Sequence, residues 1–238
     1  MIHGFLSGPE YWSAQVPFLE KNMQVVPVCL KGFGDRSDET AFETIQEMAK
    51  DVMSQLALLG IKRFHLIGHS MGGMVAQQIG HKWAEQVVSL TLYGTGPKGD
   101  LPGRFEPLQE SIKNASSFTY GDSKQRAVSS WFKNELAPQV FKQSMQLADK
   151  VSFQSYLNGL IAMNSWNGEP YISQYRMPVL IIWADSDKTY PWDEQVSVLW
   201  KGIEHSSLCI INDCAHNAHI EKPLHFNVAF GEFLQSVG

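Results

Sequence analysis

Cysteine is scarce in this chain. Three cysteines occur among 238 residues, at positions 29, 209 and 214. Their number and irregular spacing predict neither a disulfide framework nor a zinc ribbon, and we expect no bound metal. Reduced, buried thiols are typical of a cytoplasmic protein, which is the location we expect. The first residues, MIHGFLSGPEYW, show no basic segment followed by an apolar one, so we expect no secretory signal.

Long apolar runs and excess positive charge are also absent. No stretch approaches the roughly 20 uninterrupted apolar residues that a membrane-spanning helix needs. The formal net charge is −5, whereas nucleic acids and anionic membrane surfaces are bound by basic faces. We therefore expect neither a nucleic acid nor a membrane as partner. With 44% hydrophobic and 18% charged residues, the composition is that of an ordinary globular protein with one sizeable core.

Short β-rich runs alternate with helix-like segments along most of the chain. Strands separated by helices predict an α/β fold, in which a mostly parallel sheet has helices on both faces. The β-rich runs lie at 23–30, 64–68, 87–94, 178–185 and 206–213, and the helical patterns lie at 44–60, from Met71 onward and at 223–237.

The stretch 96–168 has a different pattern. It contains prolines at 97, 102 and 107, followed by helix-like pieces without a strong strand pattern. We interpret it as a helical cap inserted over the carboxyl ends of the strands, where open α/β sheets bind their ligands. The predicted organisation is a core domain in two parts, 1–95 and 169–238, around this cap.

One serine stands among unusually many small residues. Gly68-His69-Ser70-Met71-Gly72 matches the pattern G-x-S-x-G, with a strand pattern before it and a helical pattern after it. A sharp strand-to-helix turn brings neighbouring backbones so close that a Cβ at either flanking position would clash. The motif therefore predicts an exposed nucleophilic Ser70 rather than an ordinary turn serine.

Ser70 needs a base to attack at neutral pH, and the base needs an orienting acid. The segment WADSDKTYP, which ends the strand pattern near 183, offers Asp185 and Asp187. The segment CAHNAHIEKP, which follows the last strand pattern, offers His216 and His219. The residue types alone leave both choices open.

This arrangement resembles the α/β-hydrolase superfamily. Members carry a small residue, two variable positions, Asp, three further positions and Pro, a spacing found here at 184–191. Their final motif, typically Gly-His followed by Glu and Pro, is similar to 215–223. The resemblance implies that Asp187 is the acid and His216 the base, although alanine stands at two positions where glycine is usual. His219 is then expected to line the pocket.

The resemblance also implies the remaining parts of the site. HGFLSG at 3–8 is similar to the His-Gly loop of the family, which makes the backbone N–H groups of Phe5 and Met71 the expected oxyanion hole. We expect His69 and Trp131 to line the substrate pocket together with His219. Because the His-Gly loop begins at His3, the N-terminal edge strands and most of the third strand of the family are expected to be missing.

These features together predict a serine hydrolase that cleaves a small carboxylic ester or lactone through an acyl-enzyme intermediate, without a cofactor. Two alternatives stay open: a C–C bond hydrolase, and a hydrolase-fold receptor or signalling protein that binds a small ligand with little turnover. The partner expected is a small-molecule ester or lactone, and the sequence is also compatible with a homo-oligomer.

Overall fold

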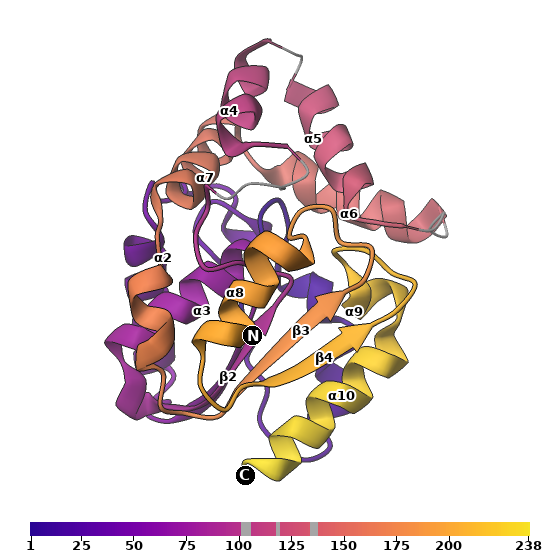
Figure 1. Cartoon of the computed structure of the whole chain (residues 1–238). Helices are drawn as coiled ribbons and strands as arrows, with labels where there is room; N and C mark the ends of the chain where they lie inside the picture. Colours follow the sequence, from indigo (N-terminus) through magenta and orange to yellow (C-terminus); the bar gives the residue numbers. More distant parts are fainter. Residues whose placement is uncertain (101–105, 118–119, 134–137) are drawn as a thin grey trace.

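The computed structural model describes residues 1–100, 106–117, 120–133 and 138–238. Its elements alternate between strands and helices along the chain, as the sequence predicts (Figure 1). The strands are β1 (Phe64–His69), β2 (Val87–Tyr93), β3 (Val179–Ala184) and β4 (Ser207–Ile211). The helices are α1 (Val16–Leu19), α2 (Ile45–Leu58), α3 (Met71–Lys82), α4 (Leu108–Ser117), α5 (Tyr120–Ser130), α6 (Pro138–Lys150), α7 (Phe153–Ser165), α8 (Ser197–Gly202), α9 (Ala218–Glu221) and α10 (Pro223–Ser236).

The four strands form one parallel sheet in the order β1-β2-β3-β4. Successive strands are joined by crossover connections, as parallel neighbours must be. Parallel pairing places all four carboxyl ends at one edge of the sheet. The loops that follow the strands, including the one that begins at Ser70, therefore meet at that edge.

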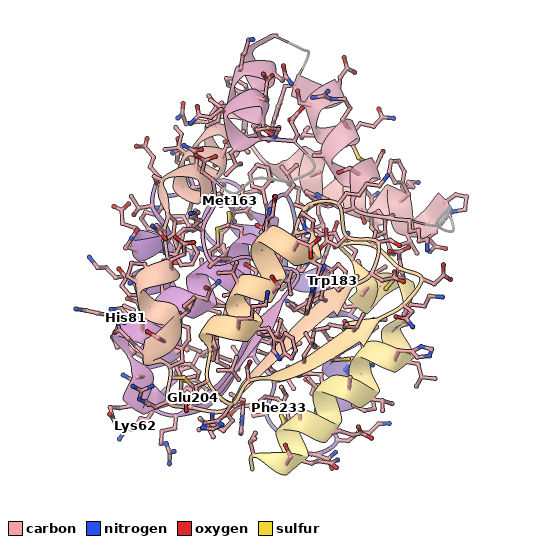
Figure 2. All side chains as sticks on the ribbon, viewed as in Figure 1. Lys62, His81, Met163, Trp183, Glu204 and Phe233 are labelled. Atoms are coloured by element: carbon pink, nitrogen blue, oxygen red, sulfur yellow. The ribbon has the colours of Figure 1, made fainter. Side chains whose placement is uncertain are left out.

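Side chains along each strand point alternately to the two faces of the sheet, and each face has its own apolar cluster. Leu66, Leu90 and Ile181 pack on the face covered by α2, α3 and α8, together with Met163 of α7 (labelled in Figure 2). On the opposite face, Ile67 and Ile182 pack against Phe230 and the labelled Phe233 of α10. Both faces of the sheet are thus buried, as expected for a parallel sheet.

The first two residues lie beside β1 and act as a short additional strand. Ile2 forms parallel bridges with Val28 on one side and with Gly68 on the other. The Ile2 N–H donates to Ile67 O at 2.8 Å, and the Val28 N–H donates to Met1 O at 2.9 Å. Toward the amino ends of the strands, a groove of about 220 Å³ lies between this region and β1, lined by apolar side chains such as Val26 and Leu66. Met1 and Ile2 therefore lie between β1 and the segment around Val28.

The prediction of a full strand at 23–30 is wrong. Among these residues only Val28 has a strand-type bridge, and the others have no regular pairing. A ladder needs a neighbour along its whole length, and Ile2 supplies a partner at a single position. Residues 23–30 are rich in apolar and β-branched side chains, but no neighbouring strand runs along most of their length.

Helices α4 to α7 lie above the edge toward which the arrowheads of β3 and β4 point (Figure 1). The chain enters and leaves this helical segment side by side, because Lys98 and Asn167 form an antiparallel bridge. The Gly168 N–H donates to Pro97 O at 2.8 Å, and the Gly99 N–H donates to Trp166 O at 3.1 Å. The segment thus leaves the core and returns to it near the predicted cap limits, and the division into domains stays a prediction. None of the described helices is long and apolar enough to cross a membrane.

Candidate active site

Ser70 lies on the sharp turn between β1 and α3. Its backbone has φ 56° and ψ −120°, a conformation that non-glycine residues rarely adopt and that costs about 1–3 kcal/mol. The Ser70 N–H donates to Tyr93 O at 3.0 Å, and the Thr95 hydroxyl donates to Ser70 O at 2.9 Å. These two hydrogen bonds join the turn to Tyr93 at the end of β2 and to Thr95 just after it.

The neighbouring glycines are required by close backbone contacts. A Cβ at Gly68 would lie 2.1 Å from Gly72 O, and a Cβ at Gly72 would lie 2.4 Å from His3 O. Both distances are far below van der Waals contact, and the atoms met are backbone atoms that cannot turn away. The clash expected from the motif is therefore found at both flanking positions.

Asp187 and His216 form a buried pair next to this turn. The Nδ1 atom of His216 lies 2.8 Å from Oδ2 of Asp187, and the two side chains are 2% and 0% exposed. The other carboxylate oxygen accepts the N–H groups of Thr189 at 2.8 Å and Tyr190 at 3.2 Å. Because a carboxylate can only accept, His216 carries its proton on Nδ1 and leaves Nε2 free to act as a base. His216 and Ser70 line the same narrow recess.

The structure distinguishes Asp187 from Asp185, the other candidate for the acid. Oδ1 of Asp185 accepts the N–H of Asp213 at 3.0 Å and the hydroxyl of Ser186, at the exposed side of the loop. Asp185 therefore fixes the loop that carries Cys214 and His216, whereas Asp187 contacts the histidine itself. The choice of Asp187 agrees with this geometry.

His219 lies behind the recess rather than in its wall. The Tyr93 hydroxyl lies 2.8 Å from His216 O and 2.9 Å from Nδ1 of His219. A carbonyl has no proton to give, so the tyrosine proton points to His216 O and the His219 Nδ1–H donates to the tyrosine oxygen. The pKa of His219 is lowered to about 3, mainly by burial and to a smaller extent by the nearby His216. His219 is therefore neutral and supports His216 through Tyr93; it also borders a separate cavity of about 680 Å³ beside α6.

His69 both lines the recess and contacts the backbone of His216. Its ring stacks on Tyr93 at 4.5 Å between centroids, and its Nε2–H donates to His216 O at 3.1 Å. Burial, followed by the proximity of His216 and His219, holds the pKa of His69 well below its usual value. The carbonyl of His216 is thus fixed by two donors, one from His69 and one from Tyr93. Tyr93 was not singled out from the sequence, although its place at the end of a β-rich run was a usable signal.

The loop at 3–8 lies directly against Ser70. The Leu30 N–H donates to Nε2 of His3 at 3.1 Å, and the His3 Nδ1–H donates to Gly4 O at 2.8 Å. Burial lowers the pKa of His3 to about 4, so this side chain is a neutral brace. Phe5 lines the recess with Ser70, and Met71 is the first residue of α3, whose N–H has no partner within the helix. The two N–H groups expected to form the oxyanion hole therefore belong to Phe5, which lines the recess with Ser70, and to Met71, which directly follows Ser70.

Trp131 borders the recess from the cap. Its ring centroid lies 6.0 Å from that of His216, and its carbonyl accepts the N–H of Asn217 at 3.1 Å. Beyond Trp131 and Phe5 lies a cavity of about 470 Å³ beneath α5, within the range of small-molecule sites. Within the described residues, no cluster of three or more His, Cys, Asp or Glu side chains could hold a metal ion.

Comparisons with known proteins agree with this architecture. Over 99% of its length, the chain is 25% identical to a 2-hydroxy-6-oxo-6-phenylhexa-2,4-dienoate hydrolase of Comamonas testosteroni, of which 86% is covered. The enol-lactonase of Burkholderia xenovorans superposes with a TM-score of 0.89 at 20% identity, over 98% of this chain and 90% of that one. An esterase of Thermogutta terrifontis superposes with a TM-score of 0.88 at 22% identity, over 99% and 88% of the two chains. The family model of the alpha/beta hydrolase fold matches residues 1–223, and the chain therefore belongs to the α/β-hydrolase fold family.

Proposed function

We propose that this chain is a serine hydrolase that cleaves a small carboxylic ester or lactone through an acyl-enzyme intermediate. The observation that carries the proposal is the buried contact of 2.8 Å between Asp187 and His216, beside a strained serine at the end of β1. A serine on a strained turn, next to a base with an orienting acid, is the arrangement that nucleophilic acyl transfer requires.

The proposed reaction uses each of these groups in turn. Nε2 of His216 takes the proton of Ser70 as its oxygen attacks the acyl carbon, and the Asp187 carboxylate stabilises the resulting imidazolium. The N–H groups of Phe5 and Met71 stabilise the oxyanion. His216 then gives the proton to the leaving alkoxide, so that an acyl-Ser70 ester and a free alcohol are formed. Water, deprotonated by the same histidine, attacks this ester, and His216 returns the proton to the Ser70 oxygen as the carboxylic acid is released.

Steady-state hydrolysis of p-nitrophenyl esters of increasing acyl length tests the proposal. We expect turnover by the unmodified chain and a loss of at least ~10³-fold in Ser70→Ala, because the nucleophile is removed and only binding contributions stay. The same chain treated with a fluorophosphonate should gain one phosphonyl group, located on Ser70 by mass spectrometry. Equal ester turnover in both proteins would disprove the assigned nucleophile. A single slow acylation without turnover would instead favour the receptor alternative.

A second candidate follows from one relative. The chain is 25% identical to a hydrolase named for a 2-hydroxy-6-oxo-dienoate, so carbon–carbon bond hydrolysis by the same site is the alternative activity. Decay of the visible absorbance of that dienoate, compared with ester turnover by the same preparation, decides between the two. A cytoplasmic location and a homo-oligomeric state stay predictions.

A further inference from the structure

We propose that Gly159 of α7 determines which acyl chains the site accepts, because it leaves room for the ring of Phe5 to lie against the helix. This inference rests on the proposed function, since it concerns the part of the ester that extends away from the reacting carbonyl. It predicts a substrate with an apolar acyl chain of several carbons. It also predicts that one methyl group added at position 159 shortens the chain that the site accepts.

Phe5 lies between the recess that contains Ser70 and the cavity of about 470 Å³ beneath α5. Phe5 and Trp131 line both spaces, so the recess and the cavity meet at these two aromatic rings. Tyr156 adds a third ring to the cavity wall, 5.1 Å from that of Phe5, whereas exposed side chains such as Gln125 line it farther out. In the proposed reaction the acyl chain stays attached to Ser70 through both steps, and we assign this cavity to it.

Gly159 leaves space that a side chain would fill. It lies in the interior of α7, where glycine is less favourable than alanine and the helical backbone does not require it. A Cβ at this position would lie 2.7 Å from Cε2 and 3.0 Å from Cδ2 of Phe5. Both distances are well below the roughly 3.5–4.0 Å of an ordinary contact between carbon atoms. The ring of Phe5 therefore occupies its place only because residue 159 has no side chain.

The helix that carries Gly159 is fixed to the loop before α2. The Ala41 N–H donates to Oγ of Ser155 at 3.0 Å, and Nδ2 of Asn158 donates to Ala41 O at 2.8 Å. Ser155 and Asn158 are 0% and 4% exposed, so breaking these hydrogen bonds would leave buried polar groups unpaired. A methyl group at position 159 would therefore displace the ring of Phe5 rather than the helix.

The surroundings of Phe5 determine where a displaced ring can go. The ring of Phe33, which is 0% exposed, lies 5.9 Å from that of Phe5 and blocks one side. The larger open space that Phe5 borders is the cavity beneath α5. A ring pushed into that space narrows the connection between the recess and the cavity, and an acyl chain long enough to enter the cavity is then excluded.

Steady-state hydrolysis of p-nitrophenyl octanoate and p-nitrophenyl acetate tests the inference, and the readout is the ratio of their kcat/KM values. We expect Gly159→Ala to lower this octanoate-to-acetate ratio about tenfold or more. The ratio separates a narrowed passage from general damage, because a distorted site lowers both rates together. Gly231→Ala is the matched control: its Cβ would lie 3.0 Å from Cε1 of Phe18, but on α10, at the opposite face of the sheet. It should keep the ratio.

Two further variants depend on the ring of Phe5 itself. Phe5→Ala removes the ring and keeps the backbone N–H, so it should raise the octanoate-to-acetate ratio about fivefold or more. Adding Gly159→Ala to Phe5→Ala should then change the ratio by less than about twofold, because the new methyl group no longer meets a ring. Phe5→Ala alone tests the passage even where Gly159→Ala does not fold.

The outcomes distinguish this inference from the proposed function. Esters cleaved with dependence on Ser70, but with the same ratio in Gly159→Ala, Phe5→Ala and the unmodified chain, would overturn the role of Gly159 and leave the proposed function standing. An equal fall of the ratio in Gly231→Ala would also overturn it. Ethyl and octyl acetate vary the alcohol instead, and an effect of Gly159→Ala confined to this pair would disprove the assignment to the acyl chain. Absence of Ser70-dependent cleavage of every ester would overturn both proposals.

Discussion

Ser70 holds a backbone conformation that its neighbours allow only because they lack side chains. The carbonyls of His3 and Gly72 lie where Cβ atoms at Gly72 and Gly68 would stand. The strain at Ser70 is thus maintained by close packing of the turn against the loop at 3–8. The positions of the Ser70 hydroxyl and of the two proposed oxyanion donors depend on that packing.

Replacing one of these glycines should be far more damaging than replacing a glycine elsewhere. We expect Gly72→Ala to lower the free energy of unfolding by about 3 kcal/mol or more, because its Cβ would lie 2.4 Å from His3 O. Gly121→Ala is the matched control: nothing lies within 4 Å of its Cβ, and alanine favours helix α5 by up to about 1 kcal/mol. Urea unfolding followed by circular dichroism measures both. Similar stabilities of the two variants would contradict the packing argument.

The two neighbouring aspartates should differ sharply in their effect on activity. In Asp187→Asn, the amide oxygen must face the N–H groups of Thr189 and Tyr190, so the amide NH₂ faces Nδ1 of His216. The histidine then carries its proton on Nε2 and cannot accept the proton of Ser70. We expect kcat for a p-nitrophenyl ester to fall about 10³- to 10⁴-fold.

Asp185→Asn is the control for this change, because its side chain accepts hydrogen bonds at the exposed side of the loop. We expect its kcat to stay within about threefold of the unmodified chain. A larger loss in Asp185→Asn than in Asp187→Asn would reverse the assignment of the acid.

At this scale, the sequence predicts the residues whose spacing is fixed by chemistry. Ser70 follows from its motif, and the choices of His216 over His219 and of Asp187 over Asp185 follow from the resemblance. The supporting role of Tyr93 could not be predicted, because it depends on which side chains the fold brings together from distant segments, and no local pattern records that.

At the scale of elements, one carboxylate connects the end of α5 to the loop that carries His216. Oε1 of Glu221 accepts the N–H of Lys133, just after α5, at 3.1 Å, and Oε2 accepts the N–H of Ala215 at 2.7 Å. Ala215 directly precedes His216. The carboxylate therefore couples the position of the cap to that of the histidine, because one group satisfies a backbone donor on each side.

Glu221→Gln should weaken this connection, because an amide has one accepting oxygen for two backbone donors. Its NH₂ group would then face one of the two N–H groups. We expect a loss of about 1–3 kcal/mol in the free energy of unfolding and a fall of about tenfold in kcat/KM. Glu232→Gln, an exposed change on α10, should leave both quantities near those of the unmodified chain. Unchanged kcat/KM in Glu221→Gln would show that the base does not depend on this contact.

Most elements of the core could be predicted because their periodicity is strong and their limits carry turn signals. The helix expected at 44–60 is found at Ile45–Leu58, and the run at 178–185 becomes Val179–Ala184. The run at 23–30 failed because strand formation depends on a neighbour, which a single segment cannot reveal. Apolar β-branched residues indicate a preference for pairing, not the presence of a partner.

For the whole molecule, the buried histidines predict how stability depends on pH. Burial lowers the pKa of His3 to about 4 and that of His219 to about 3, whereas an unfolded histidine titrates near 6.5. Between pH 6.5 and about 4 the unfolded chain therefore binds protons that the folded chain does not. The two neutral histidines contribute fully to the free energy of unfolding above pH 6.5. This contribution is lost on acidification, by up to about 1.4 kcal/mol per pH unit for each histidine.

Urea unfolding at several pH values between 6.5 and 4.5 measures this slope. We expect His3→Gln to have a shallower slope by up to about 1.4 kcal/mol per pH unit, since one protonation site is removed. His205→Gln changes a side chain that is 90% exposed and should keep the slope of the unmodified chain. The same slope in all three proteins would exclude the buried histidine as a source of the acid sensitivity.

Because Ile2 pairs at a single residue, we expect the hydrogen bonds on this side of the sheet to open more easily than those between β1, β2 and β3. Residues 23–28 connect to β1 through Met1 and Ile2, whereas β2 pairs with strands on both sides. Amide hydrogen exchange should then show two classes, with Val28 exchanging through local openings and Leu92 only through global unfolding. Deuterium uptake should therefore be faster in peptides covering 23–28 than in peptides covering 87–93. The loop at 3–8 continues directly from Ile2, so such openings would also change how often the site next to Ser70 is fully assembled.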